Sequence, residues 1–141
     1  MKSEIKFEIE LDKDRIPEKI FWDATENPNE GINESKAISI SVWDHYHKGL
    51  MGINLWTKDM PVDEMNHFAV DMIGNLAQML KDSTQDTKVI GILDNAGREI
   101  AKYLKEQAEK EAKENGESAP PADDLAGLLA NTKKQLADKK K

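Results

Sequence analysis

The sequence has 141 residues, of which 38% are hydrophobic and 33% charged, and its formal net charge is −7. This length suits one domain with a modest core, and the chain is too apolar to be disordered throughout. The negative charge argues against general nucleic-acid binding, which needs a concentrated cationic surface. No stretch approaches the roughly 20 apolar residues of a membrane span, and the start lacks the pattern of a secretory signal. We therefore expect a cytoplasmic protein without membrane insertion. Cysteine is absent, which excludes disulfides and thiol chemistry.

Apolar and polar residues alternate at the two-residue period of a strand over much of the first 56 residues. In the first strand all four apolar side chains fall on one face, and in the second Ile20 and Trp22 share a face while Phe21 points the other way. The last two strands are close enough to form an antiparallel hairpin. The predicted strands cover residues 4–11, 18–23, 37–43 and 50–56.

A first helix is predicted after the fourth strand, because apolar residues then recur at helical spacing. It runs from about Pro61 to Lys81. Asp59 and Pro61 suit a cap and a first-turn proline, and Asp63 and Glu64 suit the positive end of the helix dipole.

A second helix is predicted to begin after Asp86 and to stop at Asn115 and Gly116. Gly91 and Gly97 weaken it by about 1 kcal/mol each relative to alanine, and we expect both to lie off the deepest part of its apolar stripe.

The predicted fold is α+β: a four-stranded antiparallel sheet with two helices packed on one face, a two-layer sandwich. The domain covers residues 1–114. A linker with two prolines follows at 115–124, and residues 125–141 form an amphipathic or disordered tail. The same order of elements occurs in the SecB export chaperone fold, a likeness of topology alone.

Residues with catalytic or metal-binding chemistry have simpler explanations. His45 and His47 have a spacing that suits metal ligands on a strand, but they fall in a predicted turn without a clear third ligand. Asp59, Asp63 and Glu64 are explained by helix capping rather than acid–base catalysis. Motifs typical of phosphate loops, serine nucleophiles and zinc helices are missing. We expect no catalytic residues, no metal site and no cofactor.

Large apolar side chains form the candidate interaction site. If the aliphatic side chains of the third and fourth strands face the helices, strict alternation places four large apolar side chains on the opposite side of the sheet. A monomer would leave these four side chains exposed to solvent. The alternative is that wrapping of the sheet edge or a strand bulge buries these side chains. The four residues are Phe21, Trp43, Leu50 and Trp56. Three methionines at helical spacing, Met65, Met72 and Met79, are instead expected to fill the core.

The tail offers a second candidate contact. Asp123 or Asp124 suits the cap of a short helix with Leu125, Leu128 and Leu129 along one stripe. Such a helix is marginal alone and would form on a partner or on the domain. A solubilising, disordered end is the alternative.

Three stretches resemble the gliding motility protein GldC family of Bacteroidetes and related bacteria, over roughly residues 1–110. One joins the fourth strand to the first helix at 55–65, another opens the chain at 1–7 and leads to 15–20, and the third links the helices at 83–86. The resemblance implies a role in gliding motility and assigns no catalytic residues.

Our first hypothesis is a non-enzymatic accessory protein that resembles GldC and acts through protein–protein interaction. Its partners would belong to the gliding or export machinery, or it would form a homo-oligomer. The alternative is a SecB-like holding chaperone for unfolded export substrates. An enzyme or small-ligand binder is a third, weaker hypothesis.

Removing residues 117–141 should leave the melting temperature of the domain almost unchanged, because no apolar core stripe of the second helix reaches past Ala108. Thermal unfolding of the full chain and of the shortened chain, followed by circular dichroism, measures this. A large loss of stability in the shortened chain would show that the tail packs on the domain.

Overall fold

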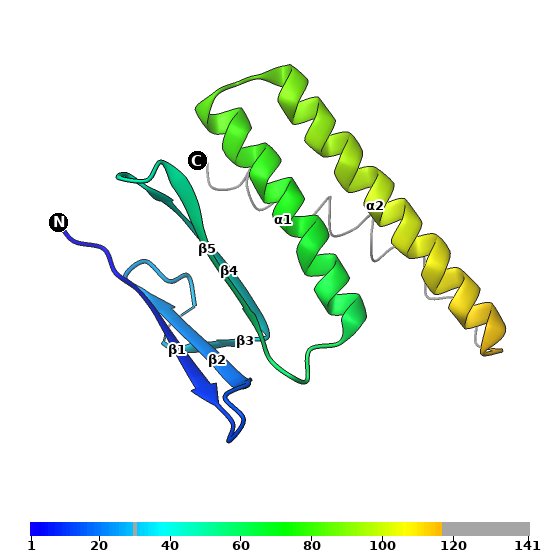
Figure 1. The fold of residues 1–141 in the computed structure, drawn as a ribbon, viewed down its shortest axis with the longest axis horizontal. Coiled ribbons are helices and arrows are strands. Elements are labelled where there is room, and N and C mark those ends of the chain that lie inside the picture. Colours follow the sequence, from blue (N-terminus) through cyan, green and yellow to red (C-terminus); the bar gives the residue numbers. More distant parts are fainter. Residues whose placement is uncertain (30, 117–141) are drawn as a thin grey trace. The chain divides into compact units, whose positions relative to one another are not determined.

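A computed structural model describes residues 1–29 and 31–116 of the chain (Figure 1). Within these residues five strands precede two helices, so the predicted α+β class is confirmed. The chain forms two compact units. Residues 1–65 contain every described strand, and the residues from Asn66 onward contain most of both helices.

Three strands form an antiparallel meander in the first unit: β1 (Ile5–Leu11), β2 (Pro17–Ala24) and β3 (Asn33–Ser35). The register sets Ile20 of β2 between Ile9 of β1 and Ser35 of β3, and the Ile20 side chain is completely buried. Along β2, Ile20 and Trp22 share one face and Phe21 lies on the other, as the alternation predicts.

A separate hairpin is formed by β4 (Ala37–Asp44) and β5 (Gly49–Trp56). Its register is regular from end to end and pairs Ala37 with Trp56 and Asp44 with Gly49. Directly opposite residues of antiparallel strands share a face. Ile38, Ile40 and Val42 therefore lie on the same face as Leu55, Ile53 and Met51.

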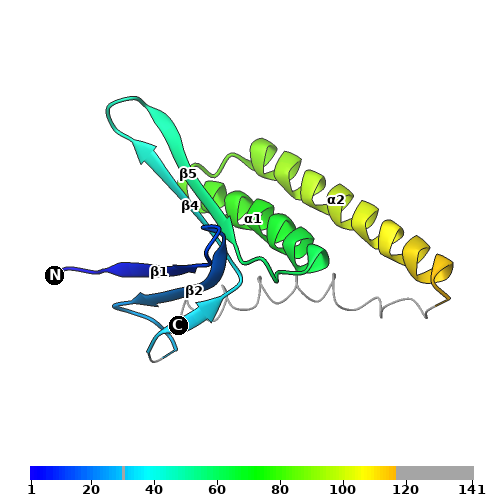
Figure 2. The same cartoon turned by 60° about the horizontal axis from the view of Figure 1, so that its bottom comes forward.

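The predicted single four-stranded sheet is wrong, because the described strands form a three-stranded and a two-stranded sheet (Figure 2). The sequence reading missed β3, since three residues are too few to show alternation. The chain bends at Lys36, between β3 and β4. There the Lys36 carbonyl accepts a hydrogen bond from the Thr57 N–H at 2.8 Å, and the Pro17 carbonyl accepts one from the Lys58 N–H at 3.1 Å. These bonds tie the residues just after β5 to both sheets.

The turn between β1 and β2 is organised by Asp12. Its Oδ1 accepts hydrogen bonds from the N–H groups of Asp14 at 2.9 Å and Ile16 at 3.0 Å. Its carbonyl accepts one from Arg15, which adopts a left-handed φ of 65°. The Ile16 bond, together with the weaker contributions of Asp14 and Lys58, lowers the pKa of Asp12. The ionised carboxylate therefore stabilises this turn.

Helix α1 (Val62–Ser83) begins with Asp63 and Glu64 in its first turn, as predicted. The predicted capping role of Asp59 is wrong. The Pro61 carbonyl accepts the first helical bond, from Met65 at 3.0 Å, so Pro61 occupies the cap position rather than the first turn. Asp59 lies two residues earlier, and its carboxylate instead pairs with the Lys36 ammonium.

A short link joins α1 to helix α2 (Thr87–Glu114), and its residues cap the end of α1 and the start of α2. Gln85 takes a left-handed φ of 55°, and its N–H reaches back to the Leu80 carbonyl at 3.0 Å, which ends α1. The Asp86 side chain then accepts from the N–H groups of Lys88 and Val89, which starts α2. At the far end Asn115 caps the helix and Gly116 has a φ of 71°, which confirms the predicted stop.

The two helices lie side by side in the second unit and meet at Gly97 (Figures 1 and 2). A Cβ atom at Gly97 would lie 3.5 Å from Cγ2 of Ile73, and Gly97 is buried. The expectation that Gly97 lies off the buried stripe is therefore wrong, whereas a Cβ at Gly91 would meet no atom. Burial on α2 also continues to Ala112, one turn past the predicted end of the stripe. Neither described helix is long and apolar enough to cross a membrane.

Replacing Ile73 with alanine should lower the free energy of unfolding by about 2–5 kcal/mol, towards the lower end because the side chain is half-buried. Phe68, also half-buried on α1, should behave similarly. Val62→Ala is the control, since Val62 is 78% exposed and should change stability by less than about 0.5 kcal/mol. Urea unfolding measures all three. Equal effects of Ile73→Ala and Val62→Ala would show that the helix contact is misassigned.

Replacing Asp12 with asparagine should lower the melting temperature at neutral pH, because a neutral amide accepts the turn N–H groups less strongly. A carboxyl group with a lowered folded-state pKa stabilises the fold above its unfolded-state pKa of about 3.9, and the effect is lost as the pH falls through the folded-state pKa. The wild type and Asp12→Asn should therefore converge in acid. Melting curves from neutral to acid pH measure this, with Asp14→Asn as the control in the same turn. A constant difference at every pH would contradict the role of the Asp12 charge.

Candidate functional site

Three of the predicted interaction residues share one face of the β4–β5 hairpin. Trp43 and Leu50 lie directly opposite each other, and Trp56 projects from the same face near the other end of β5. Their exposed fractions are 68%, 69% and 52%. We call Trp43, Leu50 and Trp56 the aromatic face.

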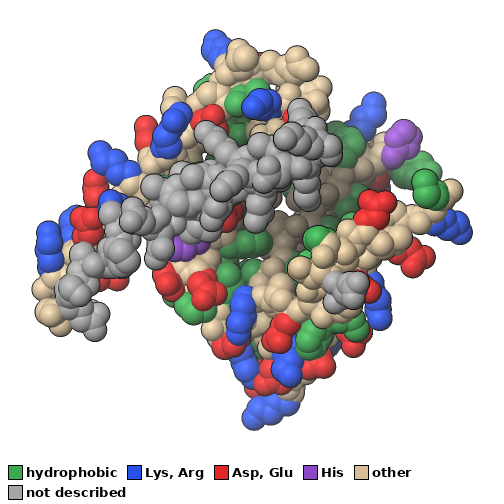
Figure 3. Space-filling view, turned by 180° about the vertical axis from the view of Figure 1, so that it is seen from behind, with side chains coloured by type: hydrophobic (Ala, Val, Ile, Leu, Met, Phe, Trp, Pro, Cys, Tyr) green, Lys and Arg blue, Asp and Glu red, His purple; other side chains and the backbone are tan. Residues whose placement is uncertain are grey.

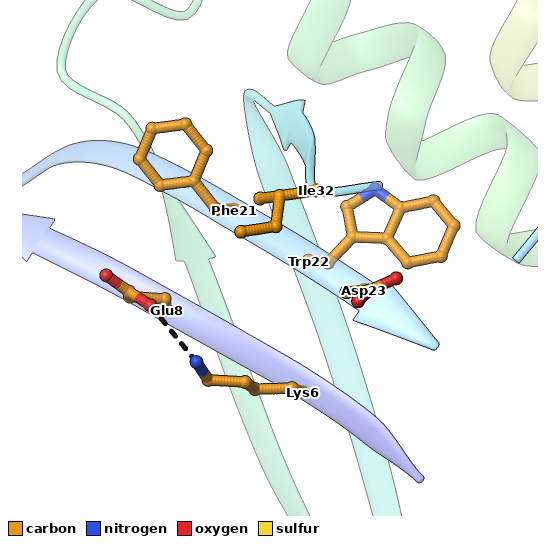
Figure 4. A pocket seen from close by; sticks show the side chains of 6 residues that line it. All are labelled: Lys6, Glu8, Phe21, Trp22, Asp23 and Ile32. Carbon is orange, nitrogen blue, oxygen red and sulfur yellow. Dashed lines mark hydrogen bonds and ion pairs between the residues drawn. The ribbon is translucent and has the colours of Figure 1, made fainter. Parts of the chain in front are cut away.

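Phe21 does not join the aromatic face through strand pairing. It belongs to the other sheet, where the register places it between Glu8 of β1 and Glu34 of β3. It is half-buried and lines a shallow depression beside Ile32 and the Lys6–Glu8 ion pair of 3.4 Å (Figure 4). This depression has a volume of about 20 Å³, little more than the space of one water molecule.

The opposite face of the hairpin is also apolar, and its burial is uneven. Ile38, near the bend, is buried, whereas Val42, Met51 and Ile53 are 51%, 60% and 55% exposed. Sequence reasoning assigned this whole face to the core and so missed these three residues as surface residues. The signal available was the absence of charge from residues 37–43 and 49–56 in a chain that is one-third charged.

On the face shown in Figure 3, charged side chains of both signs are interspersed, with apolar side chains exposed among them. Strand β1 carries charges of both signs, because Lys6, Glu8 and Glu10 occupy its polar face. The hairpin therefore differs from β1 in that residues 37–43 and 49–56 of its strands carry no charge.

The turn that joins β4 to β5 is built on Asp44. Its carboxylate accepts from the N–H groups of Tyr46 and His47 and pairs with His47 Nδ1, and this pairing lowers the pKa of Asp44. His45 instead packs edge-on against Tyr46, with ring centroids 5.5 Å apart. In the part of the chain that the structure describes, three or more metal-ligand side chains do not gather anywhere.

The acidic residues near the bend are engaged in ion pairs. Lys58 Nζ lies 2.8 Å from Glu18 Oε1 and 3.3 Å from Asp12 Oδ2, and these partners, Glu18 first, raise the pKa of Lys58. The hydrogen bond from Lys36 lowers the pKa of Asp59. A catalytic acid needs a pKa raised towards neutrality, so the lowered pKa of Asp59 suits a structural ion pair.

The remaining predicted residues belong to the C-terminal tail and to helix α1. Leu125, Leu128 and Leu129 lie outside the described residues. Met65 and Met72 are half-buried, as core residues would be, but Met79 is 57% exposed, so its assignment to the core is wrong.

Comparison with known proteins gives a family match. The family model described as gliding motility-associated protein GldC-like matches residues 17–106, from β2 into α2. No curated protein and no solved structure gives a significant match. Because the family model covers more than half of the sequence, the chain belongs to the GldC-like family of gliding motility-associated proteins.

Proposed function

We propose that this protein is a non-enzymatic accessory of gliding motility that binds a protein partner through the aromatic face. The observation that supports this function is the cluster of Trp43, Leu50 and Trp56, each more than half exposed on one face of a regular hairpin. Tryptophan is enriched among the residues that dominate binding energy at protein interfaces. We place this protein in the cytoplasm, with a partner in the gliding or export machinery.

The shape of the surface favours a protein over a small molecule. Small-molecule sites are concave, with volumes of about 300–1,000 Å³, far above the 20 Å³ of the depression at Phe21. The aromatic face instead projects large side chains from a two-stranded sheet, and each aromatic side chain can bury about 150–250 Å² against a partner. A projecting apolar surface suits contact with another protein.

A holding chaperone for unfolded export substrates is the second candidate. One observation favours it: the outer half of the hairpin exposes apolar side chains on both faces, with Val42, Met51 and Ile53 behind Trp43 and Leu50. Such a two-sided surface would bind extended apolar segments without demanding one complementary shape.

Replacing both Trp43 and Trp56 with serine should leave the chain folded and weaken partner binding at least tenfold, because contact area is lost rather than core. The partner is first captured from a gliding bacterium that carries this protein, then purified, and its affinity is measured by calorimetry. Ile5→Ser with Leu11→Ser is the matched control, since these residues are 70% and 51% exposed on the other sheet.

Equal weakening by the control would show that the contact is not localised to the aromatic face. Unfolding of the double tryptophan variant would show that these residues belong to the core. Suppression of aggregation of several unrelated unfolded proteins, lost in the tryptophan variant, would favour the chaperone over the accessory.

A further inference from the structure

We propose that two copies of this chain pair through the outer edges of their β4 strands. The pairing is antiparallel, with Ile40 opposite Ile40 of the second copy, and it joins the two hairpins into one four-stranded sheet. This inference concerns self-association, so it does not depend on the partner in the proposed function.

The β4 edge has backbone groups available for such a pair. In an antiparallel pair successive residues turn their N–H and C=O groups alternately towards and away from the partner strand. The hydrogen bond from Thr57 to Lys36 fixes this alternation, so Ala37, Ser39, Ser41 and Trp43 turn their backbone groups away from β5. Among the described residues no strand pairs with that edge, and two strands alone are marginally stable.

The sequence does not protect this edge. Soluble proteins commonly place charged side chains, particularly lysine, or proline on open edge strands to prevent pairing with another chain. Strand β1 follows this rule with Lys6, Glu8 and Glu10, but residues 37–43 contain neither charge nor proline. An unprotected edge is suited to a strand partner.

A second copy fits the edge residue by residue. With Ile40 on the twofold axis, Ile38 faces Val42 of the second copy, Ser39 faces Ser41, and Ala37 faces Trp43. Because Trp43 pairs with Leu50 and Ala37 with Trp56 inside each hairpin, one continuous row forms across the four strands. That row is Leu50 and Trp43 of one copy followed by Ala37 and Trp56 of the other.

Charge selects the β4 edge over the β5 edge. In the β4 pair Lys36 faces Asp44 of the second copy, which brings opposite charges near each other at both ends, although Lys36 also pairs with Asp59 and Asp44 with His47 within each copy. The equivalent β5 pair, with Ile53 on the axis, would set Lys58 opposite Lys48 of the second copy, and like charges directly opposite are destabilising.

Edge pairing leaves the faces of the sheet uncovered, so the aromatic face stays available to another partner. The dimer would be held by backbone hydrogen bonds between the two β4 strands and by side-chain contacts between opposite residues, such as Trp43 and Ala37 of the second copy.

Single cysteines test the register, because the natural chain has none. In Ile40→Cys the two α-carbons would lie about 4.5 Å apart in a non-hydrogen-bonded pair, within the range that a disulfide bridges. Ile53→Cys is the matched control, since Ile53 is the cross-strand partner of Ile40. Its two copies would be three strand spacings, about 14 Å, apart. We expect mild oxidation to link Ile40→Cys at least tenfold faster than Ile53→Cys.

A second pair of variants covers the case in which the change at half-buried Ile40 disturbs folding. Ser39→Cys and Ser41→Cys alter exposed side chains and should link to each other when mixed, but each alone should link slowly. The wild type should sediment at about twice 15.9 kDa. A monomeric mass, faster linking of Ile53→Cys, or no gain on mixing would overturn the inference. If only the proposed function were wrong, the tryptophan variant would bind its partner with unchanged affinity, and all three of these results would still be obtained.

Discussion

The arrangement of the first unit depends on two backbone hydrogen bonds at the bend around Lys36. The chain pairs with β2 up to Ser35 and with β5 from Ala37 onward. The bonds from Thr57 to Lys36 and from Lys58 to Pro17 close this exchange, and Thr57 is only 2% exposed. Without them the hairpin would be an isolated pair of strands, which is marginal in water.

Ion pairs surround these buried bonds without replacing them. Lys58 pairs with Asp12 and Glu18, and Lys36 pairs with Asp59. The Glu18 and Asp59 side chains are more than half exposed, where such pairs contribute little stability, whereas the Asp12 side chain is only 17% exposed. These ion pairs affect the position of the chain more than its stability, because Lys58 reaches both ends of the β1–β2 turn. The hairpin is thereby held at its base while residues 37–43 and 49–56 carry no charge, and this combination produces both the aromatic face and the open edge.

The sequence predicted the elements that rest on local patterns. The long strands, both helices and the helix link at Gln85 and Asp86 follow from alternation, helical periodicity and capping chemistry. It could not predict β3 or the division into two sheets, because pairing between distant residues leaves no periodic trace. The cap of α1 failed for a similar reason: Lys36, distant in sequence, competes for Asp59.

The candidate site was predictable in part. Alternation alone places Trp43, Leu50 and Trp56 on one face, and the register of β4 and β5 agrees. Alternation does not reveal how far burial extends along a strand, so the exposure of Val42, Met51 and Ile53 required the structure. For Phe21 the alternation predicted the correct face of its own strand. It did not predict that this strand belongs to a different sheet from Trp43, Leu50 and Trp56.

The absence of charge from residues 37–43 and 49–56 also has a consequence for synthesis. Its four-residue turn is local, and hairpins form in about 1–10 μs, so β4 and β5 pair almost as soon as both have left the ribosome. The 58 residues from Thr57 to the end of α2 then take roughly 3–12 s to be made at about 5–20 residues per second. During those seconds an apolar, unprotected edge is present on every nascent chain, and neighbouring ribosomes on one message bring such edges close together. Assembly through this edge would therefore be favoured while the protein is still being made.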